Sequence, residues 1–182
     1  MIPINEFVVE PNKLMRYDNV EKIGDVDFIT SASLEDHKVS NRVANVLEVP
    51  LRYEGPVKKG YKLIVHHNVF KYYNDMRGKR KSGKSYFFGD KFLIDDEQWY
   101  MYHDGNSWHA REGSCFVEPI KLLTGSRLPL HGVMRYPDSY LKSKGVVDGV
   151  EVIFEPESEY EFNIDGTILY RMTSQSVVAY GK

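Results

Sequence analysis

The chain has 182 residues, of which 42% are hydrophobic and 27% charged, so it can bury a core as one domain or as two small ones. Its formal net charge of −2 gives no overall attraction to nucleic acid or to an anionic membrane, and its single cysteine excludes an internal disulfide. Apolar runs are far too short for a membrane span, and the start lacks the pattern of a signal peptide, so we expect a cytoplasmic protein.

The residue pattern predicts a mostly β protein. Thirteen tyrosines, nine phenylalanines and two tryptophans favour strands over helices, and no stretch has sustained helical periodicity. Asp165-Gly166 predicts a tight hairpin turn, because both central residues of a type I′ turn need positive φ. The predicted strands, separated by Gly, Pro and Asp residues, are 7–11, 43–50, 62–73, 86–88, 92–102, 108–112, 115–119, 150–154, 160–164, 168–170 and 177–180.

Between Pro11 and the strand at Val43 the chain shows little β pattern. An apolar island in this stretch contains Val26, Phe28 and Ile29. A loop of this length inside a compact domain is typically functional or mobile. The alternative is that the segment 33–36 caps one short helical turn.

The segment 75–85 is strongly basic and broken by glycines, which predicts an exposed hairpin tip. We expect Tyr86–Phe88 to pair back across this tip. The segment 78–85 also matches the P-loop pattern, but β-prone residues follow it where a phosphate-binding loop needs a helix. Five basic residues with aromatic neighbours could instead contact single-stranded nucleic acid, although a solvated hairpin end is the simpler interpretation: Arg77, Lys79, Arg80, Lys81 and Lys84, beside Tyr72, Tyr73, Tyr86 and Phe87.

Other reactive residue types form no catalytic or metal-binding pattern. His66, His67, His103 and His109 lack metal-ligand spacing, and adjacent histidines on a strand would point to opposite faces. Cys115 is expected in the core. Glu155, Glu157, Glu159 and Glu161 alternate as the exposed face of a strand would. We therefore expect no enzyme, no metal and no cofactor.

Several features recur in the same order, which suggests an internal duplication. The boundary is expected near Leu122–Gly125, giving units 1–121 and 122–182. The corresponding pairs are Val43–Pro50 with Gly132–Pro137, Lys62–Val65 with Val150–Phe154, Phe92–Glu97 with Phe162–Gly166, Trp99–Tyr102 with Ile168–Tyr170, and Cys115–Pro119 with both Phe7–Pro11 and Val177–Tyr180.

With these pairs aligned, the chain resembles the GroES-type co-chaperonin family. The second unit carries the likeness in Gly149–Phe154, Ile164–Tyr170 and Ser174–Ala179. The first unit adds the opening strand Phe7–Pro11 and the long loop, where Asp27–Ala32 stands near the place of the family's apolar tripeptide. The resemblance implies two tandem GroES-like small β-barrel units with antiparallel strands and long loops, in a divergent and possibly viral member.

The resemblance also implies a function in recognition. A loop bearing Val26, Phe28 and Ile29 would cap or bind a chaperonin ring and assist folding, each weak contact being multiplied by symmetric presentation. Edge strands Phe7–Pro11 and Val177–Tyr180 would seal a homo-oligomer. The location would be the cytoplasm, of a bacterial host cell if the protein is viral.

Two alternatives stay open. The same fold could form a structural oligomer in a virus particle, with no chaperonin partner. The second alternative is a β-barrel that binds single-stranded nucleic acid through the basic tip, in a salt-sensitive manner.

Overall fold

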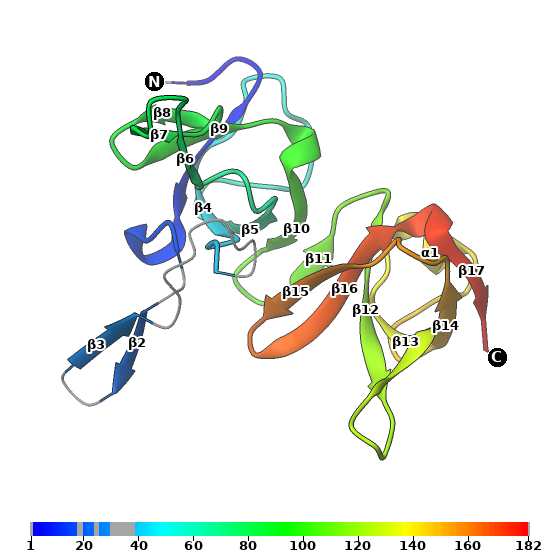
Figure 1. The fold of residues 1–182 in the computed structure, drawn as a ribbon. Coiled ribbons are helices and arrows are strands. Elements are labelled where there is room, and N and C mark those ends of the chain that lie inside the picture. Colours follow the sequence, from blue (N-terminus) through cyan, green and yellow to red (C-terminus); the bar gives the residue numbers. More distant parts are fainter. Residues whose placement is uncertain (1, 18–19, 24–25, 30–38, 182) are drawn as a thin grey trace. The chain divides into compact units, whose positions relative to one another are not determined.

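The computed structural model describes residues 2–17, 20–23, 26–29 and 39–181, which form two compact units, Met1–Asn106 and Ser107–Lys182 (Figure 1). Nearly all regular structure is antiparallel β-strand, which confirms the mostly β prediction. The boundary between the units lies earlier than the expected one after residue 121. A boundary there would separate β12 (Ser114–Lys121) from β13 (Arg127–Tyr136), two strands that are hydrogen-bonded to each other.

In the first unit, strands β10, β5, β4, β1, β9 and β8 are hydrogen-bonded in that order, each pair antiparallel. Two further hairpins, β2–β3 and β6–β7, stand apart from this sheet. The elements of the unit are β1 (Phe7–Pro11), η1 (Asn12–Leu14), β2 (Val20–Ile23), β3 (Val26–Ile29), β4 (Val43–Glu48), β5 (Lys62–Val65), β6 (Tyr72–Asn74), β7 (Arg80–Ser82), β8 (Tyr86–Phe88), β9 (Lys91–Ile94), η2 (Asp96–Gln98) and β10 (Trp99–His103).

In the second unit, strands β17, β14, β13, β12, β16 and β15 are hydrogen-bonded in that order, again all antiparallel. The β15–β16 turn has Asp165 and Gly166 at φ 50° and 84°, which confirms the tight hairpin turn and the positive φ predicted for both residues. The elements of this unit are β11 (Trp108–Ala110), β12, β13, α1 (Ser139–Ser143), β14 (Glu151–Phe154), β15 (Tyr160–Ile164), β16 (Thr167–Thr173), η3 (Ser174–Ser176) and β17 (Val177–Tyr180).

Six strands of each unit share one order. Numbered along the chain, β10, β5, β4, β1, β9 and β8 of the first unit read 6-3-2-1-5-4, and so do β17, β14, β13, β12, β16 and β15 of the second. A 3-10 turn, η2 or η3, connects the fifth strand to the sixth in both units. The first unit differs by its two added hairpins, of which β2–β3 lies between the first and second strands and β6–β7 between the third and fourth. Among the described residues neither sheet closes into a barrel.

This topology corrects part of the residue alignment expected from sequence. By position, β4 corresponds to β13 and β5 to β14, as predicted. Cys115–Pro119, in β12, was expected to match both β1 and β17, and by position it corresponds to β1. However, β9 corresponds to β16 and β10 to β17, so the expected matches of Phe92–Glu97 and Trp99–Tyr102 were one element out of place. The short apolar segments are too similar to one another for a single sequence to show which strand of one unit corresponds to which strand of the other.

Each unit has its own core. In the first, aromatic and β-branched side chains pack together, including Phe7, Phe92 and Trp99 from strands and Phe70 from the connection between β5 and β6, all at most 3% exposed. In the second, sulfur-containing and β-branched side chains, among them Cys115, Met134, Val152 and Met172, pack together with Phe154. Cys115 is fully buried, which confirms its predicted place in the core, and burial raises the pKa of its thiol to about 12.

Candidate functional site

The candidate binding elements are the two hairpins that the first unit has and the second lacks. The second unit joins the corresponding strands by short connections, residues 122–126 and 155–159. Connections of a stable sheet tolerate insertion and commonly carry binding residues, because the strands they join are already held by pairing and burial. An insertion present in only one of two similar units is therefore the best indication of a specialised role.

The hairpin β2–β3 carries the residues expected to contact a partner. Val26, Phe28 and Ile29 lie in β3, where the loop was expected to have little β pattern. Their partners in β2 are Ile23, Glu21 and Val20. The sequence does contain a signal for this hairpin: a β-prone segment of four residues lies on each side of Gly24-Asp25. The expected helical turn at 33–36 lies outside the described residues.

The base of this insertion is held by buried side chains. A bridge between Tyr17 and Ser40 brings the two ends of the insertion together. Asn41, buried, donates from Nδ2 to the carbonyl oxygens of Asn12 (2.9 Å) and Met15 (2.6 Å). These hydrogen bonds fix the chain immediately before and after the insertion, whatever its own conformation.

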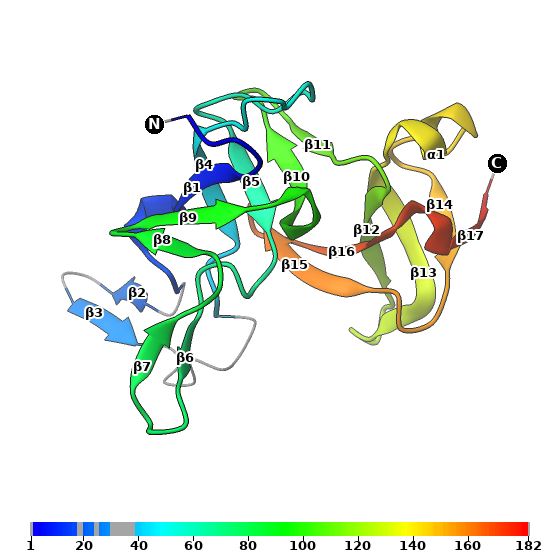
Figure 2. The same ribbon diagram turned by 90° about the horizontal axis from the view of Figure 1, so that it is seen from above.

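The hairpin β6–β7 carries the predicted basic residues. Arg80 and Lys81 lie in β7, Arg77 and Lys79 in the turn before it, and Lys84 just after it. The predicted hairpin tip is confirmed, but its strand pairing was wrong: Tyr72–Asn74 pairs with Arg80–Ser82, and Tyr86–Phe88 pairs with β9. As Figure 2 shows, the two strands extend as a narrow ribbon.

The turn of this hairpin is organised by Asp75. One oxygen of its carboxylate accepts hydrogen bonds from the amides of Arg77 and Lys79, both at 2.9 Å, and its other oxygen lies 3.2 Å from Lys81 Nζ. The Lys79 amide in particular, with the Arg77 amide and Lys81, lowers the pKa of Asp75, against the opposing effect of desolvation. Strand β8 follows Ser85 directly, so the P-loop pattern here opens no helix.

Arg16 and Tyr17 connect the ribbon to the base of the other insertion. The Tyr72 amide donates to the Tyr17 hydroxyl at 2.8 Å, and their rings stack with centroids 6.2 Å apart. Arg16 places its guanidinium 4.2 Å from the Tyr72 ring centroid and donates to Ser82 Oγ at 3.0 Å. Sequence reasoning missed both residues, because neither belongs to a motif and the contacts span more than fifty positions.

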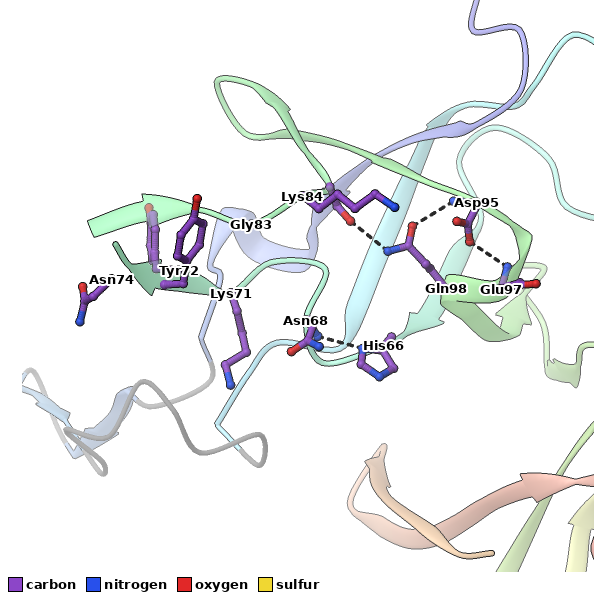
Figure 3. Close-up of a pocket in the computed structure, with 12 residues that line it drawn as sticks. His66, Asn68, Lys71, Tyr72, Asn74, Gly83, Lys84, Asp95, Glu97 and Gln98 are labelled. Carbon is purple, nitrogen blue, oxygen red and sulfur yellow. Dashed lines mark hydrogen bonds between the residues drawn. The ribbon is translucent and has the colours of Figure 1, made fainter. Parts of the chain in front are cut away.

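A cavity of about 800 Å³ lies where the ribbon meets the sheet (Figure 3). One part of its wall is basic and aromatic, with Lys71, Lys84, Tyr72 and Tyr73. The other part contains His66, Asn68 and the η2 turn, where Gln98 donates to Ser85 Oγ at 3.0 Å and the Asp95 carboxylate accepts from the Glu97 amide at 2.9 Å. The cavity is open to solvent, and its lining mixes charged, polar and aromatic side chains, which suits a ligand that has both charged and aromatic groups.

Several of the histidines and glutamates noted in the sequence lie in other positions than expected. His66 and His67 follow the end of β5 in a turn, and their ring centroids are 4.2 Å apart, so the expectation that they point to opposite faces was wrong. Glu155, Glu157 and Glu159 lie in the turn between β14 and β15, with Glu157 at φ 60°, rather than along a strand. Among the described residues, no three His, Cys, Asp or Glu side chains are grouped to hold a metal ion.

No protein-family model and no curated protein sequence matches this chain. In the described part of the chain, no helix has the length and apolar character that crossing a membrane requires.

Proposed function

We propose that the protein is a non-catalytic, co-chaperonin-like binding protein with two GroES-like units, whose β2–β3 hairpin contacts a chaperonin ring. One observation carries this proposal: two units share a strand order, and only the first has a hairpin between its first and second strands, bearing Val26, Phe28 and Ile29. The family that the sequence resembles carries its recognition loop at this place. Recognition through such an element needs no catalytic group, cofactor or metal.

The mechanism follows from the attachment of the hairpin. Its ends are fixed by the Tyr17–Ser40 bridge and by Asn41, so the entropy lost on binding is confined to the inserted residues. A short apolar strand presses few side chains into a groove, so each contact is weak. A homo-oligomer presenting several copies would bind strongly through effective concentration.

The test is co-sedimentation with a bacterial chaperonin ring and measurement of its ATPase rate, with the unaltered chain and with Phe28→Asp plus Ile29→Asp. Nucleotide-dependent binding that the double variant loses supports the proposal. The matched control is Leu123→Asp, because Leu123 is fully exposed on the corresponding connection of the second unit and should be dispensable. Absence of binding by the folded, unaltered chain contradicts the proposal for that chaperonin.

A second candidate is a structural oligomer of a virus particle, favoured by an open sheet edge. Within the part of the chain that the structure describes, strand β17 pairs with β14 alone, and Val178 in β17 is 65% exposed. Unpaired edges invite pairing with another chain. The other expected edge was wrong: β1 is paired on both sides, with β4 and β9. Stable oligomers without chaperonin binding, disrupted by Val178→Pro, would favour this candidate.

A further inference from the structure

We propose that the β6–β7 ribbon and the cavity at its base form a binding site for single-stranded nucleic acid, separate from the chaperonin-binding role of β2–β3. The first support is the concentration of charge. Six lysine and arginine residues lie within positions 71–84 against one acidic residue, Asp75, in a chain whose overall net charge is −2. Such local density attracts a polyphosphate backbone even when the whole protein does not.

The two faces of the ribbon have different environments. Residues directly opposite in an antiparallel pair share a face, and the pairs are Tyr72 with Ser82, Tyr73 with Lys81, and Asn74 with Arg80. The face with Tyr72 and Ser82 is covered by Arg16, which contacts both. The opposite face presents Tyr73, 52% exposed, beside Lys81, whose side chain is 51% exposed.

An exposed ring beside a lysine is an arrangement that binds single-stranded nucleic acid. An unpaired base stacks on the ring, and the Lys81 ammonium, which also lies 3.2 Å from the Asp75 carboxylate, contacts an adjacent phosphate. The fixed position of Tyr72 against Tyr17 and Arg16 holds the ribbon in place, so Tyr73 is offered on a preorganised support. A surface that bound polyanions in general would need only the positive charges and would gain nothing from Tyr73.

The cavity extends this surface toward the sheet. Lys71 and Lys84 border it together with Tyr72 and Tyr73, and its volume of about 800 Å³ is sufficient for a nucleotide (Figure 3). Acidic Asp95 and Glu97 on the far wall disfavour a phosphate there. The bound nucleic acid is therefore expected to run along the ribbon side of the cavity. A base, rather than a phosphate, would then be directed toward the η2 wall.

The test is fluorescence anisotropy with a labelled twelve-nucleotide oligothymidine, on the full chain, across a range of salt concentrations. Tyr73→Leu, which keeps an apolar side chain but removes the aromatic face, should weaken binding by about 10-fold. Arg77→Ala plus Lys79→Ala should weaken it further and reduce the slope of log K against log salt by about 1.4. Lys142→Ala plus Lys144→Ala, exposed lysines of the second unit, makes the same charge change and should alter neither quantity.

Three results would overturn the inference. The first is no binding by the unaltered, folded chain at low salt. The second is an equal loss in the control pair, which would mean that only net charge matters. The third is that polyglutamate or duplex DNA binds as tightly while Tyr73→Leu has no effect, which would assign the ribbon to an acidic protein or a duplex. Chaperonin binding is measured separately, with β2–β3 variants, so failure of one proposal leaves the other standing.

Discussion

The two units are built on one strand order with different interiors and different connections. The first fills its core with Phe7, Phe70, Phe92 and Trp99, whereas the second uses Cys115, Met134 and Met172. Because antiparallel pairing is made by the backbone, the order of strands survives changes in the side chains of the core, provided that each inner face stays apolar. The connections are under no such constraint, and the two hairpins of the first unit occur there.

The connection from the second to the third strand shows how differently one link can be stabilised. In the first unit Tyr53 packs against Phe7 with ring centroids 4.8 Å apart. In the second unit the link contains α1, whose N-cap Asp138 is buried and accepts hydrogen bonds from the Leu141 amide, the Gly113 amide and Ser174 Oγ. One unit therefore depends on an aromatic contact and the other on a buried carboxylate.

The largest expected effect is that of Asp138→Ala. The substitution removes the acceptor of three donors, of which the Leu141 amide and Ser174 Oγ are buried, and it removes the cap of α1. It should therefore lower the free energy of unfolding by about 3 kcal/mol. Urea unfolding combined with peptide-resolved hydrogen exchange should place the loss in residues 107–182. Ser139→Ala, at an exposed neighbouring position, is the control; an equal loss of protection in the first unit would contradict the independence of the two cores.

Gly132→Ala tests the close approach of β12 and β13. A Cβ at this position would lie 2.3 Å from Val117 Cγ1 and 2.7 Å from the Glu118 carbonyl oxygen, so backbone must shift. We expect a loss of about 2 kcal/mol in unfolding free energy, measured by urea denaturation. Gly181→Ala should be neutral, since the nearest atom to its Cβ is 3.9 Å away. A stable Gly132→Ala variant would mean that the strands separate easily.

Replacing residues 18–38 by a short Gly-Ser linker makes the first unit resemble the second. Because Tyr17, Ser40 and Asn41 are retained, the change in unfolding free energy should stay below about 1 kcal/mol, while chaperonin binding is lost. Thermal unfolding checks the expected stability, and the ATPase assay checks the expected loss of chaperonin binding. Unfolding of the first unit by this replacement would show that the hairpin is required for the fold.

The smallest expected effect concerns the β6–β7 turn and pH. The folded pKa of Asp75 is lowered from 3.8, so its contribution to the turn is present above pH 3.8 and is lost as pH falls through the lowered value. Its carboxyl carbon, followed by NMR, should titrate with a midpoint below 3.8, and Asp75→Asn should loosen the turn without altering the sheet. A midpoint at or above 3.8 would contradict the amide hydrogen bonds described above.

Local features of the sequence determined much of this molecule. The bounds of β1, β15 and β17, the Asp165-Gly166 turn, the core position of Cys115 and the basic hairpin tip followed from β-branched and aromatic segments and from residues suited to positive φ. Each of these features depends on only a few neighbouring residues, because backbone sterics and side-chain type determine local conformation directly.

Only the tertiary structure decided which strands are neighbours. It placed β1 in the interior of its sheet and showed that β9 of the first unit corresponds in position to β16 of the second. It also paired β8 with β9 by hydrogen bonds and brought Arg16 and Tyr17 against Tyr72. Many pairings of short apolar strands satisfy the same alternation, and the choice among them is made by burial summed over the whole unit. For that reason the sequence indicated candidate binding residues, whereas their common base at Tyr17 became visible only in the fold.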